Sequence, residues 1–196
     1  KNVFTSNKQT IRFNSNFDNE IDIPFLNYNT KNKIAKLSSE MEIGKNYINL
    51  KNFSLIEDKS FFSLKKIYLK NKKLVSFESI SVKTFKDKIL NNDFTIKFGK
   101  TIEIDGTKYD SSNLTKLFNK NNKSKFLKKI NNNIKVNIKE VNTSVSDVIS
   151  DFTLIGSLKN GNFYKISSKG KFYEDKYLEI SLKEEKHSNK KNLEIY

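Results

Sequence analysis

The single histidine is considered first, because histidine is a common general base and metal ligand at neutral pH. His187 stands in the run Lys-Glu-Glu-Lys-His-Ser-Asn, between two strand-like segments. The chain has no cysteine and no second histidine. A zinc thiolate site, a cysteine nucleophile and a histidine-based triad therefore lack the side chains they need. We interpret His187 as a solvent-exposed loop residue.

Two short motifs match catalytic or nucleotide-binding patterns only in part. Ser63 and Ser168 each precede a lysine by three positions, as in acyl enzymes with a Ser-x-x-Lys motif. Neither serine opens a predicted helix, where that chemistry places it. Gly99-Lys100-Thr101 resembles the end of a phosphate-binding loop, but Phe94 occupies the position where that motif requires glycine. We expect no enzyme activity and no catalytic residue.

Three carboxylates alternate along one short segment. Asp18, Glu20 and Asp22 would share one side of a strand and could offer oxygen ligands to calcium. Ile21 and Ile23 alternate with them, which favours a solvated strand face beside an apolar one. We expect no metal site and no cofactor.

The formal net charge of +15 would suit a nucleic-acid-binding protein. Of the 37 basic residues, however, only Arg12 is an arginine. Surfaces that read bases or clamp phosphates favour arginine, because its planar guanidinium binds in a bidentate way. Abundant lysine and asparagine are also typical of proteins from AT-rich genomes. We expect no nucleic-acid partner.

Period-two alternation of apolar residues dominates the chain and predicts β-strands. The alternating pairs and triplets recur about every 10 to 16 residues, a spacing typical of antiparallel sheets. Asn160-Gly161 predicts a hairpin turn, and Asp105-Gly106 and Lys169-Gly170 also read as turns. The pattern predicts a mainly β fold built as an antiparallel meander. Its clearest apolar positions are Ile11, Phe13, Met41, Ile43, Ile48, Leu50, Phe62, Leu64, Ile67, Leu69, Ile80, Val82, Phe94, Ile96, Phe98, Ile102, Ile104, Ile134, Val136, Ile138, Phe152, Leu154, Leu178, Ile180, Leu182, Leu193 and Ile195.

One short helix is predicted near residues 111–119. Asp110, Ser111 and Ser112 offer side-chain oxygens that could cap its first amides. Leu114, Leu117 and Phe118 then fall at helical spacing and form one apolar stripe. We expect this stripe to pack on the sheet.

The apolar alternation allows two interpretations. In the first, the apolar faces close over one another as a sandwich or barrel core. In the second, the sheet stays open and its apolar face contacts acyl chains. Alternation alone favours the closed core and does not separate the two.

Three segments resemble AsmA-like proteins of Gram-negative bacteria, and within that family its YhdP-type, periplasm-spanning members. These segments are Asn14-Ser-Asn-Phe-Asp-Asn-Glu-Ile-Asp-Ile-Pro24, Ile104-Asp-Gly-Thr-Lys-Tyr-Asp-Ser-Ser-Asn-Leu-Thr-Lys-Leu-Phe118, and Phe152-Thr-Leu-Ile-Gly-Ser-Leu158 with Lys165-Ile-Ser-Ser-Lys-Gly170. The resemblance extends along the whole chain. It is a similarity in the pattern of strands and turns, and no single motif is diagnostic. It implies a curved, U-shaped, groove-like open sheet with an apolar interior.

The resemblance also implies a role. Family members are anchored in the inner membrane, cross the periplasm and are implicated in moving phospholipid between the inner and outer membranes. Residues 1–196 would form a single segment of such a β-groove protein. The chain lacks an initial Met and ends in a strand-like pattern, so we expect it to be part of a longer protein. The resemblance implies that an anchoring segment lies outside residues 1–196. The expected partners are phospholipid, other segments of the same chain and both membranes. The residues expected to line the groove are Ile102, Ile104, Ile134, Val136, Ile138, Leu178, Ile180 and Leu182.

Overall fold

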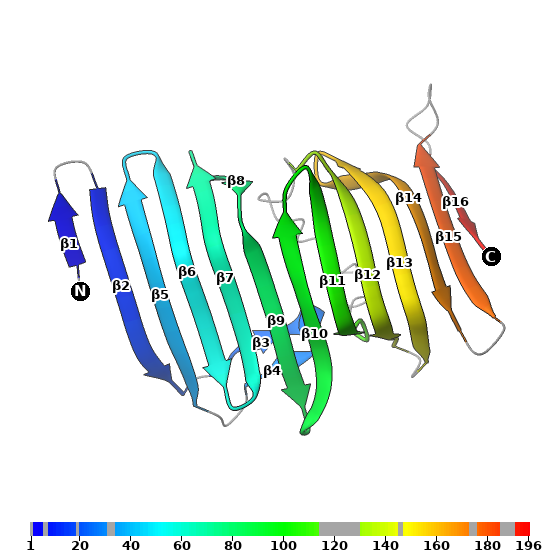
Figure 1. Ribbon diagram of the computed structural model, residues 1–196, viewed down its shortest axis with the longest axis horizontal. Helices are drawn as coiled ribbons and strands as arrows, with labels where there is room; N and C mark the ends of the chain where they lie inside the picture. The colour runs from blue at the N-terminus through cyan, green and yellow to red at the C-terminus, as the bar shows by residue number, and fades with distance from the viewer. Residues whose placement is uncertain are drawn as a thin grey trace.

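The protein folds mainly as one large open β-sheet, seen in a computed structural model (Figure 1). The structure describes residues 2–5, 8–18, 20–30, 34–113, 130–144, 147–172, 176–184 and 191–196. Fourteen strands form the sheet, which is not closed into a barrel. The mainly β fold predicted from alternation and the open sheet implied by the family resemblance are therefore confirmed, and a closed barrel is excluded.

The strands of the large sheet cover most of the described chain. They are β1 (Asn2–Thr5), β2 (Lys8–Phe17), β5 (Ala35–Gly44), β6 (Tyr47–Glu57), β7 (Ser60–Lys70), β8 (Lys73–Ser76), β9 (Ser79–Lys86), β10 (Ile89–Phe98), β11 (Thr101–Asp110), β12 (Asn132–Asn142), β13 (Val148–Lys159), β14 (Asn162–Lys171), β15 (Tyr177–Glu184) and β16 (Lys191–Ile195). Neighbours in sequence are also neighbours in the sheet, except that β2 pairs with β5 and β7 with both β8 and β9.

One pairing departs from the predicted antiparallel meander. β11 and β12 run parallel, with Thr101 opposite Asn133 and Asp110 opposite Asn142, whereas every other pair in the sheet is antiparallel. A parallel pair needs a long crossover, because the chain must return to the edge where it started. Residues 111–131 provide that length. The antiparallel prediction was wrong at this one pair.

The predicted helix falls in the same crossover. Ser112 and Asn113 form a turn, and residues 114–129 lie outside the described part of the chain, so the packing of the Leu114 stripe stays a prediction. Asp110 does cap this turn, since its carboxylate accepts hydrogen bonds from the amide and the hydroxyl of Ser112.

The hairpin turns have the geometry that right-twisted strands require. Asn160 and Gly161, between β13 and β14, both have positive φ, 52° and 72°, as expected for a type I′ turn. Asn71-Lys72 and Asp87-Lys88 have the same two-residue form, with φ between 50° and 66°. The Asn160-Gly161 prediction is confirmed.

Two glycines predicted to end strands lie inside them instead. Gly106 is in β11 opposite Phe94, and Gly170 is in β14 opposite Leu178. A Cβ at Gly170 would collide with Ile149, and one at Gly106 would collide with the backbone and Cβ of Phe94. These glycines therefore allow a close approach of neighbouring groups rather than a reversal of the chain.

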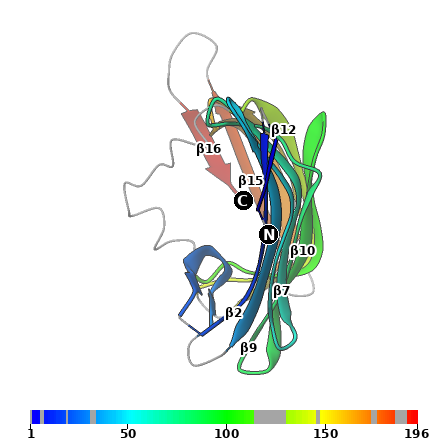
Figure 2. The ribbon, with the colours of Figure 1, turned by 90° about the vertical axis from the view of Figure 1, so that its left-hand side faces the viewer.

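A small insertion lies against the concave side of the curved sheet (Figure 2). It consists of β3 (Asp22–Ile23), the 3₁₀ turn η1 (Pro24–Leu26) and β4 (Tyr28–Asn29), with β3 and β4 paired antiparallel. Pro24 begins the turn and Asn27 ends it in the left-handed region, positions that suit these two residues. The insertion places Leu26 and Tyr28 in the core of the molecule.

Candidate functional site

The sheet has one apolar face, and strand register aligns its side chains into rows across the strands. In one row, Ile104 faces Val136, which faces Leu154. Leu154 faces Ser168, and Ser168 faces Ile180. Side chains opposite one another in register share a face of the sheet. This row therefore joins predicted lining residues of β11, β12 and β15.

A second row runs parallel to the first. Ile102 faces Ile134, Ile134 faces Gly156, and Gly156 faces Ile166, which faces Leu182. Ile138 lies two positions after Val136 in β12, and Leu178 lies two positions before Ile180 in β15. Both therefore point to the same face as these neighbours. All eight predicted lining residues thus lie on one face of the sheet. Ile102 and Ile138 are buried, and the other six are partly buried.

The same apolar face continues beyond the predicted residues into the first half of the chain. Leu37 faces Leu55, Leu55 faces Phe62, and this row continues through Val82 and Phe94. Sequence reasoning recognised most of these strands but did not include them in the lining. The signal was present, since Phe62, Val82 and Phe94 show the same alternation as Val136.

β-Bulges keep this face apolar where the alternation changes phase. Phe62 and Leu64 are followed by Ile67 and Leu69, one residue later than period two allows. Lys66, at the change of phase, has φ of 50°, and β6 and β7 keep their register across it. The β6 strand changes phase at the same level through a bulge against β5, between the pairs of Glu40 and Met41. The same change of phase occurs at Asp151, φ 51°, between Ile149 and Phe152.

The insertion covers the middle of the concave face and closes a core there. Leu26 and Ala35 are fully buried, and Tyr28 is 2% exposed. They belong to one apolar cluster with sheet residues of β6 to β13. The rings of Tyr28 and Phe62 meet edge to face, with centroids 5.1 Å apart, a favourable aromatic geometry.

A buried polar network fastens the insertion to the sheet. Asn92 donates from Nδ2 to the Leu26 carbonyl (2.7 Å) and to the Thr84 hydroxyl (2.8 Å), and its Oδ1 accepts from the Asp110 amide (2.9 Å). Asn27 donates to the Asp110 carboxylate at 2.8 Å. Because buried polar groups are costly when unpaired, this network stabilises one position of the insertion.

The pKa values of three groups respond to this environment. Burial, the hydrogen bond to Glu57 and its charge all raise the pKa of Tyr28. Burial, with the nearby charge of Asp110, raises the pKa of Tyr109 to about 12. Burial alone would raise the pKa of Asp110, but hydrogen bonds from Ser112 and Asn27 outweigh it and hold that pKa below its usual value.

The convex face is mainly polar and charged, with Ile56, Phe61 and Ile155 as exposed apolar exceptions. Lys135 and Glu179 are exposed, and ion pairs such as Lys169–Glu179 (2.8 Å) and Lys83–Asp93 (3.2 Å) connect adjacent strands. Such solvated pairs contribute little to stability. The concave face is therefore the more apolar of the two.

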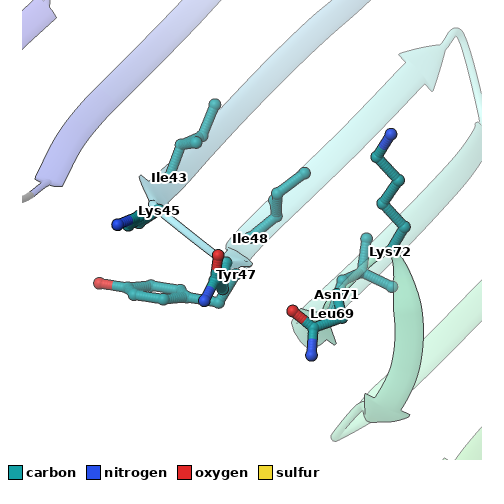
Figure 3. A pocket seen from close by; sticks show the side chains of 9 residues that line it. Ile43, Lys45, Tyr47, Ile48, Leu69, Asn71 and Lys72 are labelled. Carbon is teal, nitrogen blue, oxygen red and sulfur yellow. The ribbon is translucent and has the colours of Figure 1, made fainter.

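A pocket of about 410 Å³ opens at one side of the sheet, where strands β5, β6 and β7 begin or end (Figure 3). Its apolar wall consists of Ile43, Ile48 and Leu69, from β5, β6 and β7. Ile43 and Ile48 project to the same side of their strands (Figure 3). The turn residues Lys45 and Lys72 also line the pocket. An apolar wall beside two cations is chemically suited to an amphiphile.

The other residues considered from the sequence do not assemble into a catalytic or metal site in the described part of the chain. Ser63 lies in mid-strand, Ser168 bonds to the Ile180 carbonyl, and Gly99 and Lys100 form the turn between β10 and β11. Asp18, Glu20 and Asp22 are exposed. The described residues contain no group of three His, Cys, Asp or Glu side chains able to hold a metal ion. His187 lies outside them.

Comparisons with known protein families, with curated proteins and with solved structures found no match for this chain. Among the residues that the structure describes, no helix is long and apolar enough to cross a membrane.

Proposed function

We propose that this chain is a non-catalytic module that shields phospholipid acyl chains from water along its concave apolar face. The observation that carries the proposal is the pair of rows across β11 to β15, in which apolar side chains share one face and most stay partly exposed. A surface of this kind suits a flexible chain, because sheltering each CH₂ from water is worth about 0.8 kcal/mol without any specific polar contact.

In this proposal the chain is a segment of an AsmA-like protein of the cell envelope. It would be anchored to the inner membrane through a segment outside residues 1–196 and would act in the periplasm, in lipid transport and outer-membrane biogenesis. Phospholipid, both membranes and further segments of the same chain would be its partners, with no nucleic acid and no cofactor. The open ends of the sheet at β1 and β16 support this, because an unpaired strand edge can pair with a further segment.

One observation favours a second candidate, a structural or adhesive envelope domain with a closed core. The insertion already buries the middle of the concave face and is fixed by its own hydrogen bonds. If the rest of that face were closed in a comparable way, the apolar rows would serve only stability.

Val136→Asp distinguishes the two candidates, with Lys135→Asp on the opposite face as its matched control. In a closed core the aspartate would be buried without a partner, and the domain would unfold. In the lipid-shielding module it stays partly hydrated, so we expect a cooperative thermal transition to remain while binding of phospholipid from vesicles is lost. Unfolding of Val136→Asp alone would favour the structural candidate, and unchanged lipid binding in a folded variant would contradict the proposal.

A further inference from the structure

The strands end in turns along two opposite sides of the sheet, called its long edges here, and these two long edges carry different charges. The described turns at one edge join β5 to β6, β7 to β8, β10 to β11 and β13 to β14. Residues 45–46, 71–72, 99–100 and 160–161 of these turns include three lysines and no acidic residue. At the opposite edge, the turns of β6–β7 and β9–β10 each carry an aspartate beside a lysine, Asp58-Lys59 and Asp87-Lys88. We call the first edge the basic rim.

The pocket of Figure 3 lies where the basic rim meets the apolar face. Ile43 and Ile48 are opposite one another in register, and Ile48 faces Leu69. This apolar row lies on the same face as Leu37 and Leu55, since Leu37 and Ile43 share the phase of β5 and a bulge in β6 returns Ile48 to that face. An acyl chain seated on the concave face would therefore reach Lys45 and Lys72 at its polar end.

These two lysines are available for a ligand. Neither Lys45 nor Lys72 has an ion pair within the described residues, and both are exposed. By contrast, Lys8, Lys51 and Lys66 on the convex side are each held by a glutamate. Charge-assisted hydrogen bonds to a phosphate oxygen are stronger than neutral ones and are strengthened beside an apolar wall.

We infer that the basic rim selects lipids with a net negative headgroup, with Lys45 and Lys72 holding the headgroup phosphate and Ile43, Ile48 and Leu69 holding the start of the acyl chain. The inference rests on the proposed lipid-shielding function and adds the chemical class of the lipid. The occupant is an anionic phospholipid rather than free phosphate, because the wall beside the lysines is apolar.

The test measures binding of two single-chain lipids of equal chain length, lysophosphatidylglycerol and lysophosphatidylcholine, below their micelle concentrations, by isothermal titration calorimetry. The first has a net negative headgroup and the second a zwitterionic one. The variants are Lys45→Glu/Lys72→Glu and, as a matched control at the opposite edge, Lys59→Glu/Lys88→Glu. Lys72 and Lys88 occupy the same second position of a two-residue turn, with φ of 60° and 66°, so both pairs change net charge equally in comparable turns.

We expect the unchanged chain to bind the anionic lipid about tenfold more tightly, a factor worth about 1.4 kcal/mol. Lys45→Glu/Lys72→Glu should abolish this preference and leave the zwitterionic lipid bound as before, whereas the control pair should retain it. Equal affinity for both lipids, or the same loss in both variants, would overturn the inference while leaving lipid shielding intact. Displacement of the anionic lipid by equimolar inorganic phosphate would also overturn it. Failure to bind either lipid would instead refute the proposed function itself.

Discussion

Two regions of one apolar face differ in what lies over it. Under the insertion, Phe62, Val82 and Phe94 are at most 8% exposed and pack in a cluster with Leu26 and Tyr28. Towards the end of the chain, the same face becomes more accessible, until Leu193 and Ile195 are 58% and 60% exposed. The strands in both regions have the same alternation, so alternation establishes that a face is apolar and does not establish what covers it.

The difference comes from polar side chains rather than from apolar ones. The insertion stays in place because Asn91 and Asn92 satisfy the Leu26 carbonyl, which burial would otherwise leave without a partner. The β14 residue in the row of Ile180 is Ser168, whose hydroxyl bonds to a carbonyl of the next strand. The first region is thus built as a core, and the second leaves most of its apolar side chains partly exposed.

The largest expected effect tests whether the first region is a true core. Leu26→Ala removes a fully buried side chain and should lower the free energy of unfolding by about 2–5 kcal/mol, because a cavity adds to the lost burial. Leu154→Ala, at a partly buried position of the second region, should cost less than about 1.5 kcal/mol, in proportion to the smaller buried area. Urea unfolding of both variants measures the difference, and equal costs would mean that both regions are cores.

A smaller effect is expected from the polar network. Asn92→Ala leaves the Leu26 carbonyl, the Thr84 hydroxyl and the Asp110 amide without this partner, at a cost of about 2–3 kcal/mol. Asn137→Ala removes a solvent-side bond to Asp105 on the convex face and should change stability by less than about 0.5 kcal/mol. Thermal unfolding of the pair is the measurement, and a neutral Asn92→Ala would show that the insertion is held by apolar packing alone.

The smallest effect concerns pH. The pKa of Asp110 is lower in the folded chain than its ordinary value, because hydrogen bonds from Ser112 and Asn27 outweigh burial. A lowered carboxyl pKa stabilises the fold above the unfolded-state value, about 3.9, and this stability is lost as pH falls through the folded-state pKa. We expect Asp110→Asn to lose less stability than the unchanged chain between about pH 5 and pH 2. Parallel pH profiles of the two chains would exclude a role for this carboxylate in fastening the insertion.

The sequence predicted the strands and the face on which Val136 and Ile180 lie, because alternation depends only on local geometry. It also contained the changes of phase: the step from Leu64 to Ile67 breaks period two, and the structure has Lys66 there with φ of 50°. The parallel pairing of β11 with β12 could not be predicted, since it depends on where the 111–131 crossover returns and not on the strands themselves. Asn91 and Asn92 were also missed. The chain has 27 asparagines, so their number was attributed to overall composition and no single asparagine indicated a structural role.

The central claim, that the concave face contacts lipid tails, is tested most directly by photo-crosslinking in cells that make the protein. A photoreactive amino acid would replace Val136 or Ile180 on the concave face, and Lys135 or Glu179 on the convex face. Each pair consists of neighbours in sequence, so expression and strand position are matched while the direction of the side chain is reversed. The account predicts crosslinked phospholipid from positions 136 and 180 and none from 135 and 179. Equal capture from both faces, or none from either, would contradict it.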